Sequence, residues 1–198
     1  TTMKARLLVF LFILALANAY AADLHVYFGN LHSHTSYSDG SGTPPEAYAF
    51  ARDKGKLDFL AITEHNHRTA ESGAKDRRDG KLIATNPQLY NGTSTQSVIS
   101  AAKRFTKNGR FVALYGQEFS TISSGNHVNV FEIKDVIDDM QVTSGHFEKL
   151  LTWLDQRRDS QNALPIIQFN HPSTKLRSQS TEYGADDFGS TANWLAKM

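Results

Sequence analysis

Short apolar runs alternate along this chain with longer stretches in which apolar residues recur at helical spacing. Five runs predict β-strands, at residues 26–31, 57–62, 111–115, 127–133 and 164–169. The stretches between them predict helices at residues 44–52, 94–107 and 147–157. Strands that are apolar at nearly every position are typical of sheets covered on both faces. The alternation therefore predicts an α/β fold with a mostly parallel sheet.

Local signals support the ends of these helices. Pro44 and Pro45 stand where the first helix would begin, and Gly55 follows its end. Asn108 and Gly109 would end the second helix. Proline in the first turn and glycine after the last are the usual asymmetry of helix termini. Residues 71–92 are polar, charged and rich in glycine and asparagine, and they predict a long surface loop.

The first 21 residues have the pattern of a secretory signal peptide. Lys4 and Arg6 precede the apolar run 7–16, and Ala-Asn-Ala or Ala-Tyr-Ala then fits a cleavage site. The alternative, a membrane anchor, needs roughly 20 apolar residues, more than this run has. We expect a leader at 1–21, a single domain at 22–198, and export to the periplasm or the extracellular space without a stable membrane anchor.

Composition narrows the classes of site and partner. The chain has 198 residues, of which 40% are hydrophobic, enough for one core. Its net charge is +1 and it has no basic stripe, so nothing indicates a nucleic-acid partner. There is no cysteine, which excludes disulfides, thiolate metal sites and a cysteine nucleophile. Any bound metal would have nitrogen and oxygen ligands.

His32 and His34 are the strongest indication of chemistry. They stand two residues apart at the end of the first predicted strand, and side chains at i and i+2 point to one face. Two imidazoles on one face are half of a metal site. Asp39 adds a carboxylate in the turn that follows. The pair therefore predicts a metal centre at this strand end.

Further candidate ligands follow the other predicted strands. They are His65, Glu118, His127 and His171. In parallel α/β folds the carboxyl ends of the strands form the face where sites are built. A single histidine is more often a surface or core residue, and we assign that role to His25 and His146. The role of His67 stays open. Glu64 would point away from His65 on a strand, which favours a supporting role.

The ordered motifs resemble the PHP family, named for polymerase and histidinol phosphatase. They are His32-Ser33-His34, Ser38-Asp39-Gly40, Thr63-Glu64-His65-Asn66, Glu118 and Asn170-His171-Pro172. The resemblance implies a distorted TIM-like (β/α)7 barrel of about seven units with up to three metal ions at its carboxyl face. It also implies hydrolysis of phosphate esters with zinc, manganese or iron, which imidazole and carboxylate ligands suit alike.

Carried over by motif, the resemblance assigns ligands to two or three divalent ions. His32 and His34 would bind one ion, and Glu118 would bridge it to a second. His127 and His171 would complete the second ion, and Asp39 and His65 would bind a third. Glu118, His65 and His171 are the residues that we expect to act in catalysis. The family closes its site with a late Asp-x-His pair, and no such pair follows His171. We therefore expect the chain to be C-terminally incomplete, ending before the last strands.

The sequence thus predicts a phosphoesterase whose metal-bound hydroxide attacks a small phosphorylated substrate. Arg68, Lys175 and Arg177 lie in loops where they could contact the phosphate, although solvated surface charges are the more ordinary interpretation. Two alternatives stay open. The same centre could hydrolyse an amide or a carboxylic ester, as related barrel enzymes do, or the chain could be a non-catalytic module that binds metal or ligand.

Overall fold

The computed structural model describes residues 24–67, 82–119, 127–137 and 147–170. Five strands form one sheet in the order β1-β2-β3-β4-β5. The strands are β1 Gly29–Asn30, β2 Phe59–His65, β3 Val112–Phe119, β4 Val128–Phe131 and β5 Ile167–Phe169. The helices are α2 Pro44–Asp53, α3 Gln88–Asn91, α4 Val98–Phe105 and α6 Phe147–Asp155. The predicted signal peptide lies outside the described residues.

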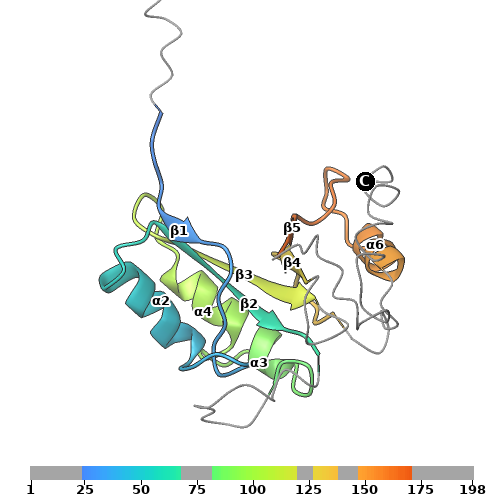
Figure 1. Cartoon of the computed structure of the whole chain (residues 1–198), viewed down its shortest axis with the longest axis horizontal. Helices are drawn as coiled ribbons and strands as arrows, with labels where there is room; N and C mark the ends of the chain where they lie inside the picture. Colours follow the sequence, from blue (N-terminus) through green and yellow to red (C-terminus); the bar gives the residue numbers. More distant parts are fainter. Residues whose placement is uncertain (1–23, 68–81, 120–126, 138–146, 171–198) are drawn as a thin grey trace, which may run out of the picture.

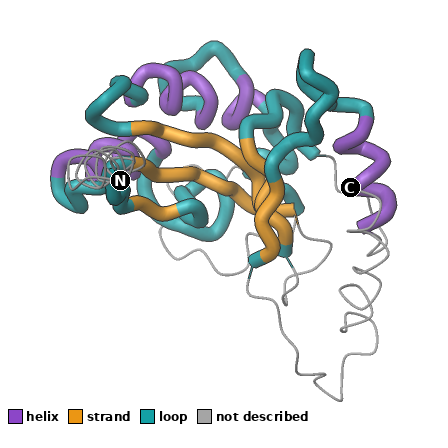
Figure 2. Tube along the Cα trace, turned by 90° about the horizontal axis from the view of Figure 1, so that it is seen from above, coloured by secondary structure: helices purple, strands orange, loops and turns teal. Residues whose placement is uncertain are grey.

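The sheet is mixed and curled, so that it forms half of a barrel (Figure 2). β1, β2 and β3 are parallel, β4 is antiparallel to β3, and β5 is antiparallel to β4. Four of the five described strands therefore share one direction, and the prediction of a mostly parallel sheet is wrong for β4. Only residues 120–127 separate β3 from β4, whereas a parallel crossover needs a dozen residues or more.

Helices α2, α3 and α4 cover one face of the parallel strands (Figure 1). Their core includes Tyr48, Ile62, Val98 and Phe111, each less than 2% exposed. Thr43 caps α2: its side chain accepts from the backbone N–H of Glu46, whose carboxylate accepts from the N–H of Thr43. Such a reciprocal cap satisfies two N–H groups that the first turn leaves open.

The prediction of a surface loop at residues 71–92 is wrong for its second half. Residues 71–81 lie outside the described part, but Leu82, Ile83 and Tyr90 are buried in the core beside α4. Tyr90 also donates its hydroxyl to the carbonyl of Ile133, 2.8 Å away. These three buried side chains anchor the segment, although Thr85, Pro87, Gln88 and Asn91 within it are exposed.

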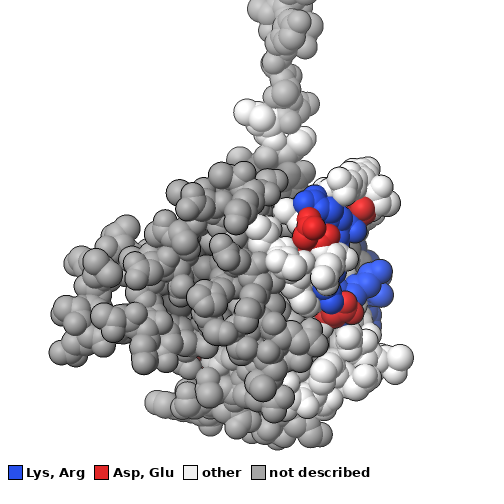
Figure 3. All heavy atoms as spheres, turned by 90° about the vertical axis from the view of Figure 1, so that its right-hand side faces the viewer, with Lys and Arg blue, Asp and Glu red and all other residues white. Residues whose placement is uncertain are grey.

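A second core lies between α6 and the antiparallel strands. Phe119, Val128, Leu150 and Leu154 meet there, each no more than 1% exposed. Outside this core, Figure 3 shows basic and acidic side chains beside one another on the described part of that face. Among the ion pairs of the described residues, Arg157 and Asp135 have 3.2 Å between Nη2 and Oδ2.

β1 is much shorter than the strand predicted at residues 26–31. Gly29 pairs with Phe59, the first residue of β2, so the residues before Gly29 extend past the start of their neighbour. Tyr27 and Phe28 are accordingly 67% and 66% exposed. No helix in the described parts of the chain is long and apolar enough to span a bilayer.

Candidate metal centre

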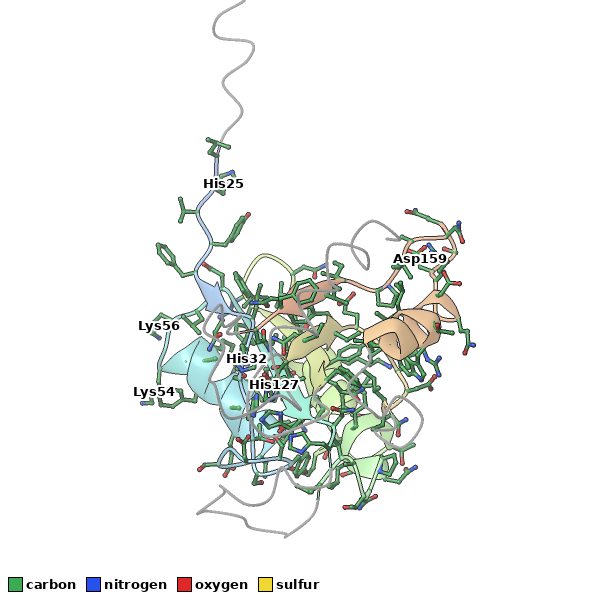
Figure 4. All side chains as sticks on the ribbon, turned by 45° about the vertical axis from the view of Figure 1, so that its right-hand side comes forward. His25, His32, Lys54, Lys56, His127 and Asp159 are labelled. Atoms are coloured by element: carbon green, nitrogen blue, oxygen red, sulfur yellow. The ribbon has the colours of Figure 1, made fainter. Side chains whose placement is uncertain are left out.

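The ends of four strands meet at one edge of the sheet. β2 ends at His65, which lies opposite Glu118 near the end of β3. Because β4 runs in reverse, it begins at this edge, and His127 immediately precedes it. β5 points the same way as β2 and β3, so Asn170 follows it here. Figure 4 shows His32 and His127 in this region and His25 far from it on the extended first segment.

Glu118 lies at the middle of the cluster and is only 1% exposed. Its Oε2 is 3.1 Å from Nε2 of His34 and 3.1 Å from Nδ1 of His65. Its Oε1 is 2.9 Å from Nδ1 of His127 and 3.6 Å from Nε2 of His32. One carboxylate thus contacts four imidazoles that come from three separate parts of the chain.

Asp39 extends the cluster toward solvent. Its Oδ1 is 2.5 Å from Nδ1 of His34, and its Oδ2 is 3.5 Å from Nε2 of His65. The turn that carries it approaches the backbone closely, since a Cβ on Gly40 would lie 2.3 Å from the carbonyl oxygen of His34. Glycine at position 40 therefore lets Asp39 reach the two imidazoles.

Glu64 stabilises the turn that carries Asp39. It is fully buried, and its carboxylate accepts from the backbone N–H of Thr35 at 2.9 Å and from the hydroxyl of Ser38 at 2.5 Å. The hydroxyl of Thr35 donates to it as well. Glu64 thus points away from His65 and anchors the segment between His34 and Asp39, in the supporting role expected from strand alternation.

The charges of the metal-free cluster are strongly coupled. Burial lowers the pKa of His34, but the carboxylates of Asp39 and Glu118 outweigh it and raise this pKa to about 10. Burial raises the pKa of Glu118, but contacts with His127 and His34 outweigh it and hold this pKa well below its ordinary value. The pKa of Asp39 is also well below its ordinary value, since contacts with His34 and His65 outweigh burial. A proton held on His34 therefore offsets part of the charge of the two carboxylates.

The geometry of the cluster would also allow divalent ions to bind. Nε2 of His34 and Nδ1 of His65 are buried, and each lies 3.1 Å from Oε2 of Glu118. Three sets of three residues could each bind an ion, with all ligand atoms within 4.8 Å of one another. They are His32/His34/Glu118, His34/Asp39/His65 and His65/Glu118/His127. Imidazole and carboxylate ligands suit zinc, iron and manganese.

Six of the seven residues expected to bind metal lie together in this cluster, and His171 lies outside the described residues. Arg68, His146, Lys175 and Arg177 also lie outside them. His25 is exposed, in keeping with the role expected for it. Whether the six residues bind metal stays a prediction.

Two amides that were not predicted from the sequence, Asn129 and Asn170, lie beside the cluster, and His67, whose role stayed open, is near it as well. Asn129 lies two residues after His127 on the same strand face, so strand alternation could have identified it. Asn170 belongs to the motif Asn170-His171-Pro172, but the motif by itself indicated no role for its amide. His67 is only 5% exposed, and its ring centroid lies 4.9 Å from that of His65. Burial and the charges of His65 and His127 lower the pKa of His67 to about 4.

No family model and no curated protein matches this chain. Among solved structures, it is similar to a two-domain protein from Bacteroides vulgatus that contains a predicted PHP-like metal-dependent phosphoesterase. The two chains are 16% identical, with a TM-score of 0.45. The similarity covers 85% of this chain and 42% of that chain, so this chain spans less than half the length of the solved protein.

Proposed function

We propose that this chain belongs to a metal-dependent phosphoesterase that acts on small phosphorylated molecules with two or three divalent ions. The observation that supports it is the cluster of three sets of potential ligands. His34, His65 and Glu118 each belong to two of these sets. Shared ligands place neighbouring ions close together, as hydrolysis of a phosphate ester at paired ions requires. Export through residues 1–21 is part of the same proposal.

The residues of the cluster would have different roles in binding the ions. Glu118 belongs to two of the three sets, so its two oxygens would bridge neighbouring ions. Asp39 is 37% exposed at the rim and would bind the outermost ion together with His34 and His65. Bound divalent ions would supply a deprotonated water near neutral pH and offset the charge of the phosphate oxygens. His171 would add a ligand beside Glu118 and His127, as the family resemblance implies.

The test is phosphate release from p-nitrophenyl phosphate by the purified full-length protein that contains this chain, loaded in turn with Zn²⁺, Mn²⁺ or Fe²⁺. We expect release with at least one metal, and at least two tightly bound ions by elemental analysis. His34→Ala should lose both metal and activity, because His34 contributes to two of the three sets. His25→Ala is the matched control, since His25 is exposed and contacts none of these sets.

A metal-loaded full-length protein that releases no phosphate, or a His34→Ala variant as active as the wild type, would contradict the proposal. The same preparations can be tested on p-nitrophenyl acetate. Hydrolysis of the acetate alone would favour the carboxylic ester alternative, and tight metal binding without either activity would favour a binding module.

A further inference from the structure

We propose that Asn129 and Asn170 are positioning residues of the metal centre. The two side-chain amides form a buried pair that determines which nitrogen of His32 and which oxygen of Glu118 face the ions. This inference rests on the proposed function, because it assumes that the cluster binds metal.

Hydrogen bonds to both the nitrogen and the oxygen of the Asn129 amide determine its orientation. Its Nδ2 donates to the carbonyl of Leu31, 3.1 Å away. Its Oδ1 accepts from Nδ2 of Asn170, 2.7 Å away. Exchanging the oxygen and nitrogen of Asn129 would lose both bonds and place like groups against each other. The oxygen of Asn129 therefore points toward Asn170 and His32.

These amides surround Nδ1 of His32. This nitrogen lies 3.2 Å from Oδ1 of Asn129, and the Nδ2 atoms of Asn129 and Asn170 are each 3.1 Å from it. Nε2 of the same ring faces the cluster, 3.6 Å from Oε1 of Glu118. Nε2 is thus the atom available to an ion.

A neutral imidazole that binds metal through Nε2 carries its proton on Nδ1. Oδ1 of Asn129, 3.2 Å away, is the nearer acceptor for that proton, and the hydroxyl of Thr63 lies 3.4 Å away. The partner of the second ring nitrogen commonly sets both the tautomer and the orientation of a metal-binding histidine.

Asn170 acts in the same way on Glu118. Its Nδ2 donates to Oε1 of Glu118 at 3.0 Å, so one N–H goes to Glu118 and the other to Asn129. Oε1 also contacts His127, whereas Oε2 contacts His34 and His65. The bond from Asn170 therefore holds the carboxylate in the rotation that distributes its two oxygens between different imidazoles.

Gln117 provides a matched control. It precedes Glu118 on β3, is fully buried like Asn129, and points to the other face of the strand. Its Nε2 donates to the carbonyl of Asp135, and its Oε1 accepts from the N–H of Ile137, both at 2.8 Å. Removal of this amide breaks two hydrogen bonds of a buried side chain but touches no residue of the cluster.

The experiment measures Zn²⁺ and Mn²⁺ affinity by competition with a chelating dye, in wild type, Asn129→Leu, Asn129→Asp, Asn170→Leu and Gln117→Leu. We expect Asn129→Leu and Asn170→Leu to weaken binding about 10- to 100-fold, the usual loss when the partner of a metal ligand is removed. Asn129→Asp keeps an acceptor for Nδ1 of His32 and should bind metal clearly more tightly than Asn129→Leu, although it loses the donor to Leu31. Gln117→Leu should lower the melting temperature and leave affinity unchanged.

Wild-type affinity in Asn129→Leu, or an Asn129→Asp variant as weak as Asn129→Leu, would overturn the inference. In the second case, metal affinity would depend on the hydrogen bond from Nδ2 of Asn129 to the carbonyl of Leu31, and not on an acceptor for Nδ1 of His32. Circular dichroism checks the fold of each variant, and if Asn129→Leu does not fold, Asn170→Leu decides. A wild-type chain that binds neither Zn²⁺ nor Mn²⁺ would overturn the proposed function itself, a result distinct from unaltered variants of a metal-binding chain.

Discussion

The two ends of β2 and β3 have opposite characters. The first half of β2 is Phe59-Leu60-Ala61-Ile62 and the second half is Thr63-Glu64-His65. β3 likewise begins with apolar residues and ends in Gly116-Gln117-Glu118-Phe119. At the amino end, a hollow of about 610 Å³ is lined by side chains such as Phe59, Phe111 and Val112, and none of its lining residues belongs to the cluster. The same two strands therefore build an apolar end and an ionisable end.

The difference separates stability from chemistry. Apolar burial at the amino end stabilises the fold by roughly 25 cal/mol per Å² of surface removed from water. The carboxyl end buries Glu118 and His65, and burying ionisable groups opposes folding unless each finds a partner. Substitutions at the amino end should therefore change the free energy of unfolding with little effect on metal affinity. Substitutions at the carboxyl end should mainly change metal affinity.

Phe111→Ala should have the largest effect on stability. Phe111 is 1% exposed and packs in the core of α2, α4 and β2. Truncating a buried phenylalanine costs about 3–5 kcal/mol, through lost burial and the cavity that remains. Denaturant unfolding measures this loss. The protein that remains folded should bind as many metal ions per molecule as the wild type. Loss of metal from protein that remains folded would show that the two ends are not separable.

Glu118→Gln should have the largest effect on metal. It removes the charge that contacts four imidazoles, so the loss should exceed the roughly 100-fold upper limit for supporting residues. Equilibrium dialysis against Zn²⁺ or Mn²⁺ measures it, with Glu132→Gln as an exposed control on the loop after β4. Unchanged affinity in Glu118→Gln would contradict the proposed bridging role.

Gly116→Ala should affect both ends, because it lies where they meet. A Cβ at this position would be 2.6 Å from the carbonyl oxygen of Val130 and 3.3 Å from Cα of Phe131, on β4. Such overpacking costs about 1–3 kcal/mol. It would also shift β4, and with it His127, relative to Glu118. We expect a lower melting temperature together with weaker metal binding, and a variant that loses only one of the two would contradict this coupling.

The smallest effect concerns the pH dependence of the metal-free chain. Since the pKa of His34 is raised from 6.5 to about 10, its stabilising contribution is complete below pH 6.5 and is lost as the pH rises toward 10. The pKa of Glu118 is lowered from 4.5, so its contribution is present above pH 4.5 and lost at lower pH. The unfolding free energy with a chelator present should therefore be highest between these values.

Urea unfolding at about pH 5.5 and about pH 9 measures this difference. In His34→Ala the decrease toward alkaline pH should become smaller. Equal unfolding midpoints at the two values in the wild type would contradict the assigned coupling.

Much of the fold followed from local patterns. The helix predicted at residues 44–52 is α2, and its proline start and capping box depend on neighbouring residues alone. His32 and His34 share the cluster, as their spacing indicated. The burial of Leu82, Ile83 and Tyr90 could not be predicted in this way, because it depends on an apolar surface that α4 offers from elsewhere in the chain.

By itself, the sequence determined where strands and helices form and which side chains stand at strand ends, because periodicity and capping act within a few residues. Tertiary structure alone decided that β4 runs in reverse and that four imidazoles surround Glu118. It also decided that Asn129 and Asn170 contact His32 and that Asn170 contacts the carboxylate. These arrangements depend on strand direction and register between segments about a hundred residues apart, and such pairing leaves no signal in any local pattern.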